Sequence, residues 1–144
     1  MSKEGFETFE HGADLGIRGW APTLEGAFCE CARAMFSQMI EGDIPSFEKF
    51  SICSQLEVEE EDLVSLLILW LNSLLAEADI RRAFFWDFDI YIFQWSHRYK
   101  LKGWSQGVSR EQVKGGVEVK GATYTQARVE KTSRGWIAQC VIDL

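Results

Sequence analysis

The stretch that decides the fold is DLVSLLILWLNSLLAEA, which occupies residues 62–78. Apolar side chains cover most of the circumference of a helix drawn through it, and helices of that kind are buried. The side chains that carry this pattern are Leu63, Val64, Leu67, Ile68, Leu69, Trp70, Leu71, Leu74 and Leu75. Because polar residues interrupt the run and it is too short to span a bilayer, it predicts the central core helix of a soluble domain.

The residues on both sides of this helix predict strands. Residues 49–58 alternate between polar and apolar side chains, which is the period of a strand with one buried face. Four acidic residues follow at 59–62, and we interpret them as favourable charge at the helix N-terminus rather than as a metal site. After the helix, residues 84–95 are rich in aromatic and β-branched side chains, which favour a further strand.

The N-terminal part predicts two short strands and a second helix. Residues 6–11 and 15–21 have the apolar content of strands, although glycines weaken their alternation. Residues 24–40 carry apolar side chains at helical spacing, with Thr23 placed to cap the first turn and Gly42 placed to end the helix. This segment therefore predicts an amphipathic helix.

The C-terminal part predicts strands joined by a loop and a tight turn. Residues 98–104 alternate as a half-exposed strand does, and the glycine- and charge-rich residues 105–116 predict a surface loop. Residues 117–131 predict a long strand, and 132–135 a hairpin turn. The last stretch, 136–144, is apolar on both faces, which indicates a strand in a central position of its sheet.

Together these segments predict one α+β domain that spans residues 1–144. We expect an antiparallel or mixed sheet of about six strands, with both helices packed on one face of it. A chain of 144 residues suits one domain, and it needs no disulfide or metal merely to fold.

Charge and cysteine content limit the classes of function. The formal net charge of −7 argues against strong direct binding of nucleic acid, which requires a basic surface. Cys29, Cys31, Cys53 and Cys140 form no CxxC motif, and we interpret them as buried thiols in a reducing cytosol. The polar N-terminus predicts no signal peptide, so we expect a cytoplasmic protein without a membrane segment.

A candidate metal site emerges from the two ends of the chain. Asp14 lies in HGADLGIRGW, residues 11–20, where small neighbours leave space for a ligand to approach its carboxylate. At the other end, Asp143 is followed by Leu144, with the terminal carboxylate. If the last strand lies beside the first, three carboxylates converge, and such oxygen clusters bind hard divalent cations. The competing interpretation is that Asp14 caps a turn and that Asp143 is solvated at a frayed end.

Several motifs, taken in order along the chain, resemble the archease family. They are HGADLGI at residues 11–17, TLEGAF at 23–28, LLILWLNSLL at 66–75, EVKGATY at 118–124 and VIDL at 141–144. Each motif is weak alone, but the ordered set covers nearly the whole chain. Two positions depart from the family pattern: Gly12 replaces the usual threonine, and Thr125 stands where histidine is frequent. Neither departure removes a proposed metal ligand.

The resemblance implies a function. Archeases are small cytosolic proteins that activate the RtcB-type RNA-splicing ligase, which joins tRNA halves with GTP and divalent metal. The resemblance therefore implies a non-catalytic, metal-binding activator that promotes guanylylation of the ligase active-site histidine and sustains multiple turnover in tRNA splicing and RNA repair. GTP and tRNA would be reached only through this protein partner.

The resemblance also implies a metal site made by Asp14, Asp143 and Leu144. Calcium is the cation we expect, with magnesium or manganese as alternatives. His11 and Lys120 match family positions and are candidates for supporting the site or contacting the partner. A different hypothesis is a stand-alone divalent-metal-dependent hydrolase acting on a phosphate-containing substrate. The sequence favours the activator, because it shows neither a nucleophile–base arrangement nor a phosphate-binding glycine loop.

Overall fold

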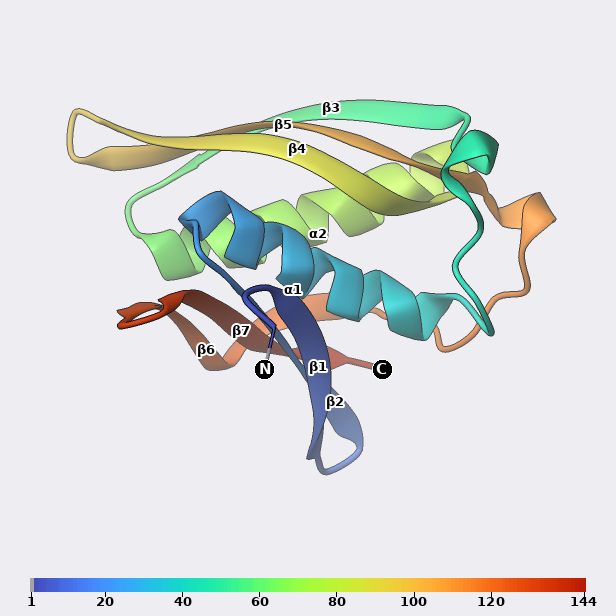
Figure 1. The fold of residues 1–144 in the computed structure, drawn as a ribbon, viewed down its shortest axis with the longest axis horizontal. Coiled ribbons are helices and arrows are strands. Elements are labelled where there is room, and N and C mark those ends of the chain that lie inside the picture. Colours follow the sequence, from blue (N-terminus) through green and yellow to red (C-terminus); the bar gives the residue numbers. More distant parts are fainter. Residues whose placement is uncertain (1) are drawn as a thin grey trace.

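The computed structural model describes residues 2–144, which fold into two antiparallel sheets with two helices between them (Figure 1). The larger sheet has the strand order β1-β2-β7-β6. Its strands are β1 (Gly5–His11), β2 (Asp14–Ala21), β7 (Gly135–Asp143) and β6 (Gly121–Thr132). The last strand, β7, therefore lies in a central position, as its apolar faces predict, and it joins the two halves of the sheet.

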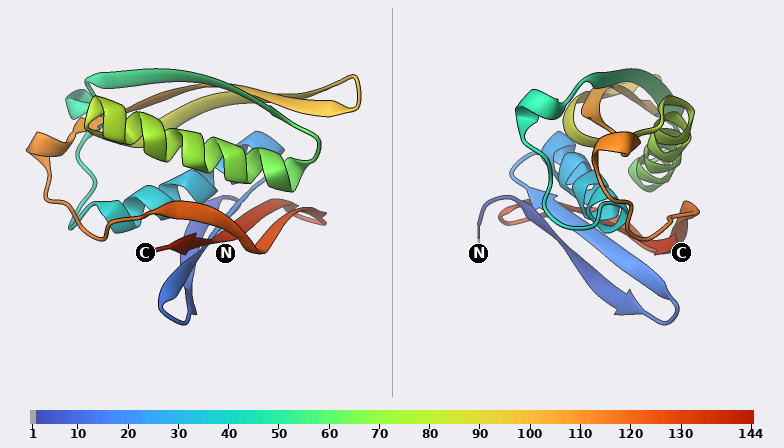
Figure 2. Two further views of the ribbon diagram at one scale, coloured as in Figure 1. Left: turned by 180° about the vertical axis from the view of Figure 1, so that it is seen from behind. Right: turned by 90° about the vertical axis from the view of Figure 1, so that its right-hand side faces the viewer.

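The smaller sheet contains three strands in the order β3-β5-β4. Its last two strands in sequence form a long hairpin, which turns at Ser96 and His97, and both of these residues have positive φ angles. The strands are β3 (Ile52–Glu60), β5 (Arg98–Ser109) and β4 (Ala83–Trp95). Both views in Figure 2 show this sheet on the opposite side of the helices from the larger sheet.

The two helices form the middle layer. Helix α1 (Leu24–Met39) begins after Thr23, whose hydroxyl accepts a hydrogen bond from the backbone N–H of Gly26. Helix α2 (Leu63–Arg81) begins after Asp62, whose carboxylate caps the first turn in the same manner. Both helices contact strands of both sheets. Two single-turn 3₁₀ helices, η1 (Phe47–Lys49) and η2 (Arg110–Gln112), complete the fold.

Helix α2 is the centre of the core. Trp70 and Leu71 are at most 1% exposed, and the fully buried set continues with Leu66, Leu67 and Leu74. The helix is long and apolar enough to cross a membrane by length and composition, but it lies inside the fold between two sheets. A helix between two sheets needs apolar side chains on two opposite sides, which explains why α2 is apolar around most of its circumference.

The structure confirms the α+β class but differs from the predicted layout. Seven strands form two sheets, and the helices lie between the sheets rather than on one face of a single sheet. The predicted loop 105–116 is wrong in its first part, because β5 continues to Ser109. The predicted strand 117–131 begins only at Gly121, since the backbone N–H of Val117 donates to the carbonyl of Gln38 near the end of α1.

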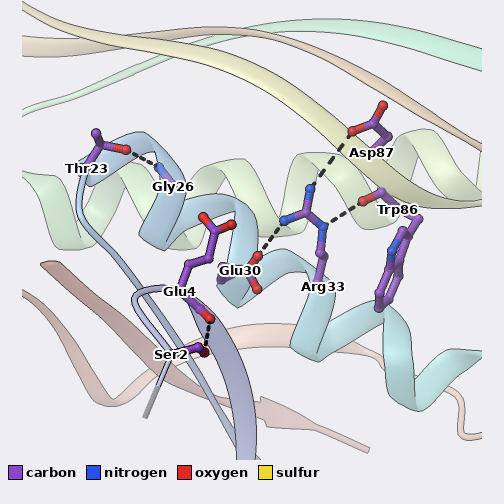
Figure 3. A network of polar contacts seen from close by, with 8 residues as sticks. All are labelled: Ser2, Glu4, Thr23, Gly26, Glu30, Arg33, Trp86 and Asp87. Atoms are coloured by element: carbon purple, nitrogen blue, oxygen red, sulfur yellow. Dashed lines mark hydrogen bonds and ion pairs between the residues drawn. The ribbon is translucent and has the colours of Figure 1, made fainter. Parts of the chain in front are cut away.

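The layers are connected by a polar network around Arg33 of α1 (Figure 3). Its Nε donates to the backbone carbonyl of Trp86 on β4 at 3.0 Å. Its terminal nitrogens meet Glu30 at 2.6 Å and Asp87 at 4.0 Å. Glu30 is only 8% exposed, so this network satisfies a carboxylate that burial would otherwise destabilise.

The four cysteines are free thiols. Cys29, Cys31 and Cys140 are buried as predicted, whereas Cys53 is exposed on β3. Burial raises the pKa of Cys29 to about 12, so this thiol is protonated at neutral pH and behaves as an apolar core residue.

Candidate functional site

The predicted site residues form a row across one end of the larger sheet. In the β1–β2 hairpin, His11 is paired with Asp14. Between β2 and β7, Leu15 is paired with Ile142, so the next step of that register sets Asp14 opposite Asp143. Directly opposed residues of an antiparallel pair share one face of the sheet. His11, Asp14 and Asp143 therefore project on the same side.

That side is the outer face, away from the helices. The neighbouring positions on the strands, Ile17, Cys140 and Ile142, are 0% exposed and belong to the core beneath α1. Because successive strand residues alternate between faces, Asp14 and Asp143 face outward. Asp14 is half-buried and Asp143 is exposed. The two carboxylates are thus accessible to a ligand or a partner on the outer face.

Asp14 is hydrogen-bonded to Leu144 at the end of β7. The backbone N–H of Leu144 donates to Asp14 Oδ1 at 3.2 Å, which joins positions 130 residues apart in sequence. The Leu144 side chain packs against the core. The structure therefore brings Asp14, Asp143 and Leu144 to one edge of the sheet, as expected if the last strand lies beside the first. Their role as metal ligands stays a prediction.

The two supporting candidates lie at the same edge. His11 is half-buried beside Asp14 across the hairpin, and Gly12 in the turn has a φ of +60°. That backbone conformation suits glycine much better than a β-branched residue, which gives a local reason for the departure from threonine at this position. The backbone N–H of Lys120 donates to the carbonyl of Asp143 at 2.8 Å, while the Lys120 side chain is exposed.

The donors fit a hard cation but form an incomplete shell. Within residues 2–144, no three side chains of histidine, cysteine, aspartate or glutamate are grouped closely enough to hold a metal alone. Two aspartates and an oxygen of Leu144 make an all-oxygen set, which is the donor type of Ca²⁺ and Mg²⁺. Because Ca²⁺ takes six to eight oxygens, the other positions would be filled by water or by a partner.

Sequence reasoning missed a second set of residues on this outer face. Along β2, the outward positions continue from Asp14 to Arg18 and Trp20. Arg18 donates to Glu7 at 2.6 Å and to the buried Gln139 at 2.7 Å. Arg128 of β6 is paired with Gln139 on its other side. The sequence offers one indication of this set: Arg18 and Arg128 occupy outward positions of two predicted strands that are far apart in the chain.

The architecture, two helices enclosed by two antiparallel sheets, places this chain in a class of small α+β proteins with solved members. A protein from Methanobacterium thermoautotrophicum matches with a TM-score of 0.81 at 28% identity, covering 97% of this chain and 99% of that one. An archease from Thermotoga maritima, described as a "possible chaperone", matches with a TM-score of 0.57 at 16% identity, covering 96% of each chain.

The family follows from the sequence matches. The model of the Archease protein family (MTH1598/TM1083) matches residues 6–144, so this chain belongs to the archease family. "Protein archease" of Thermococcus gammatolerans is 39% identical over 142 residues, covering 96% of this chain and 98% of that protein. "Protein archease" of Pyrococcus abyssi has the same identity and coverage.

Proposed function

We propose that this protein is a metal-binding accessory protein that activates an RtcB-type RNA-splicing ligase. It promotes guanylylation of the ligase active-site histidine and sustains multiple turnover, without catalysing a reaction itself. The observation that carries the proposal is the contact between Leu144 and Asp14, which lies with Asp143 at one edge of the larger sheet. Family membership supports the identity of the partner through the resemblance described above.

The incomplete oxygen shell supports a role at an interface. A cation held by Asp14, Asp143 and Leu144 would keep open positions on the outer face of the sheet. A second protein or its bound nucleotide supplies oxygens for those positions, so the ion would couple docking to the partner's chemistry. In this role GTP and tRNA are reached through the ligase, and the protein works in the cytoplasm.

The test is a multiple-turnover ligation assay with the cognate ligase, with and without this protein. We expect Asp14→Asn and Asp143→Asn to remain folded and to lose stimulation, because each removes a charged ligand without making a cavity. Asp89→Asn is the matched control, since Asp89 is an exposed aspartate on β4 of the other sheet. A folded Asp14→Asn variant with full stimulation would contradict the proposal.

A second assay separates this role from the hydrolase. Purified protein is incubated with phosphodiester and nucleotide substrates in the presence of Mg²⁺, Mn²⁺ or Ca²⁺. We expect no turnover above a heat-treated control. Robust hydrolysis that Asp14→Asn abolishes and Asp89→Asn leaves intact would favour the metal-dependent hydrolase instead.

A further inference from the structure

A groove of about 890 Å³ lies along strands of the same sheet, beyond the carboxylate edge. It is bounded by the segment before β1, by outward residues of β2 and by the β6–β7 hairpin. Along β2, Arg18 is four residues from Asp14, which corresponds to about 14 Å. The groove is therefore a separate place from the proposed metal site. Its volume falls in the range of small-molecule binding sites.

The groove is strongly cationic in a chain that is acidic overall. Its lining includes four basic residues, Lys3, Arg18, Arg128 and Arg134, and one acidic residue, Glu7. Glu7 is already neutralised by Arg18 at 2.6 Å. No carboxylate of residues 2–144 forms an ion pair with Lys3 or Arg134. A concentration of positive charge in a protein with a net charge of −7 selects an anionic ligand.

Arg128 gives a second, independent indication of an anion. Its Nε is buried and has no hydrogen-bond partner, the one side-chain nitrogen or oxygen within residues 2–144 of which this is true. The rest of its guanidinium meets only Glu130, at 3.3 Å. Buried donors without acceptors are rare in native proteins and call for an explanation such as a missing ion or ligand. A bound oxyanion would satisfy this guanidinium with a charge-assisted hydrogen bond.

Two tryptophans add a flat apolar component. Trp20 and Trp136 both line the groove. The indole N–H of Trp20 donates to the backbone carbonyl of Ser2 at 3.2 Å, so the N-terminal segment is held as one wall. Aromatic side chains beside arginines are the combination that binds nucleotides, because bases stack on the rings while phosphates meet the guanidinium groups.

We propose that this groove binds a nucleoside phosphate. The phosphate is held by Arg128, Arg134 and Lys3, and the base packs against Trp20 and Trp136. The same chemical unit is available as a free mononucleotide or as the phosphorylated end of an RNA strand. Outside the groove acidic side chains outnumber basic ones, so we expect recognition to be confined to about one nucleotide unit. The proposal is independent of ligase activation and of metal binding.

The test is calorimetric titration in EDTA, which keeps the metal site out of the measurement. The probes are the four ribonucleoside 5′-monophosphates, the matching nucleosides and inorganic phosphate. We expect at least one monophosphate to bind tenfold more tightly than its nucleoside and than inorganic phosphate. Its addition should also shift the indole signals of Trp20 and Trp136 in NMR spectra. A nucleotide that binds no more tightly than inorganic phosphate would overturn the proposal.

Matched arginine variants assign the site. Arg128→Gln should weaken nucleotide binding at least fivefold, and Arg134→Gln provides a second variant from the other side of the groove. Arg81→Gln is the control, because Arg81 does not line the groove, is exposed to a similar extent (45% against 42%) and also has an ion pair at 3.3 Å. Equal affinity of wild type and Arg128→Gln would overturn the proposal.

A pentaribonucleotide with a 5′-phosphate distinguishes the two ligands that could supply this chemical unit, a free mononucleotide and the phosphorylated end of an RNA strand. Tighter binding of the pentamer than of the mononucleotide, lost in Arg128→Gln, assigns the groove to an RNA end. Equal or weaker binding assigns it to a free nucleotide.

Discussion

Two regions of this protein use the same kinds of charged side chain in opposite ways. Between α1 and the smaller sheet, Arg33 reaches the Trp86 carbonyl and two carboxylates, and its side chain is 22% exposed. On the outer face of the larger sheet, Arg128 has a buried Nε with no acceptor. The first arginine is satisfied by the fold itself. The second retains a donor for which residues 2–144 supply no acceptor, on a side chain that is 42% exposed.

The carboxylates show the same contrast. Glu30 is almost fully buried and meets Arg33 at 2.6 Å. Asp14 and Asp143 face the same side at neighbouring positions of β2 and β7, and neither forms an ion pair within residues 2–144. Asp14 accepts one backbone N–H, from Leu144. Like charges placed opposite each other on adjacent strands destabilise a sheet, so the proposed cation would stabilise this edge.

The largest expected effect comes from breaking the satisfied region. Arg33→Met should destabilise the fold by about 3 kcal/mol, because it leaves the buried Glu30 carboxylate without its partner. Urea denaturation monitored by circular dichroism measures the change in the free energy of unfolding. Arg81→Met is the control, and we expect a loss below about 0.5 kcal/mol there because the Arg81 side chain is 45% exposed and Glu77 keeps its hydrogen bond from Ser54. Similar losses in both variants would show that the Arg33 network is not structural.

The next effect is the stabilisation of the outer edge by metal. A cation that binds only the folded state adds about 2.7 kcal/mol at a concentration of 100 times Kd. Thermal melts in EDTA, Ca²⁺, Mg²⁺ and Mn²⁺ measure it, with Asp89→Asn as the unaffected control. Asp143→Asn should abolish the metal effect and slightly raise the midpoint in EDTA, because the repulsion with Asp14 is gone. Identical midpoints in all four conditions would count against a bound ion.

The sequence predicted the elements better than it predicted their arrangement. The apolar circumference of residues 62–78 correctly placed the core helix. The last strand does lie beside the first where Leu144 donates to Asp14, which was the condition for the candidate metal site. The division into two sheets was missed because sheet membership depends on pairing between distant strands. The apolar pattern of residues 62–78 did not reveal the second sheet either, because a helix enclosed by two sheets and a helix buried beneath loops have similar apolar patterns.

The local errors have specific physical causes. Gly107 contributed to the predicted loop, but it is a strand residue whose missing Cβ makes room for the Phe84 backbone of β4. The groove was missed because Arg18, Arg128 and Arg134 are far apart in sequence and form no basic run. Only the β1-β2-β7-β6 pairing gathers them. Its cationic character therefore became visible with the tertiary structure.

A third prediction extends the comparison to pH. Ser54 of β3 donates to Glu77 of α2 at 2.6 Å, and this hydrogen bond lowers the pKa of the Glu77 carboxyl below its ordinary value. A lowered pKa in the folded state contributes stability above the ordinary glutamate pKa, and that stability is lost as the pH falls through the folded-state value. Ser54→Ala should therefore cost about 1.5 kcal/mol at pH 7.

The measurement is the free energy of unfolding of wild type and Ser54→Ala from pH 7 down to pH 3. The difference should shrink as the pH falls, because the protonated carboxyl no longer accepts a charge-assisted hydrogen bond. Ser51→Ala, at an exposed position just before β3, should show no pH-dependent difference. A cost that is constant across the range would mean that Ser54 acts only through packing.

The smallest expected effect is on the unsatisfied arginine. Arg128→Gln removes an exposed ion pair with Glu130, which contributes at most about 0.5 kcal/mol. It also removes a buried guanidinium nitrogen without an acceptor, and that nitrogen destabilises the folded state without ligand. These two terms oppose each other, so the free energy of unfolding in phosphate-free buffer should change by less than about 0.5 kcal/mol. Urea denaturation in the same buffer as the Arg33 series measures this change.

With the nucleotide that binds most tightly present in excess, wild type should gain stability and Arg128→Gln should gain less, because stabilisation by mass action follows affinity. A loss above about 2 kcal/mol without ligand would place Arg128 with Arg33, as part of the fold.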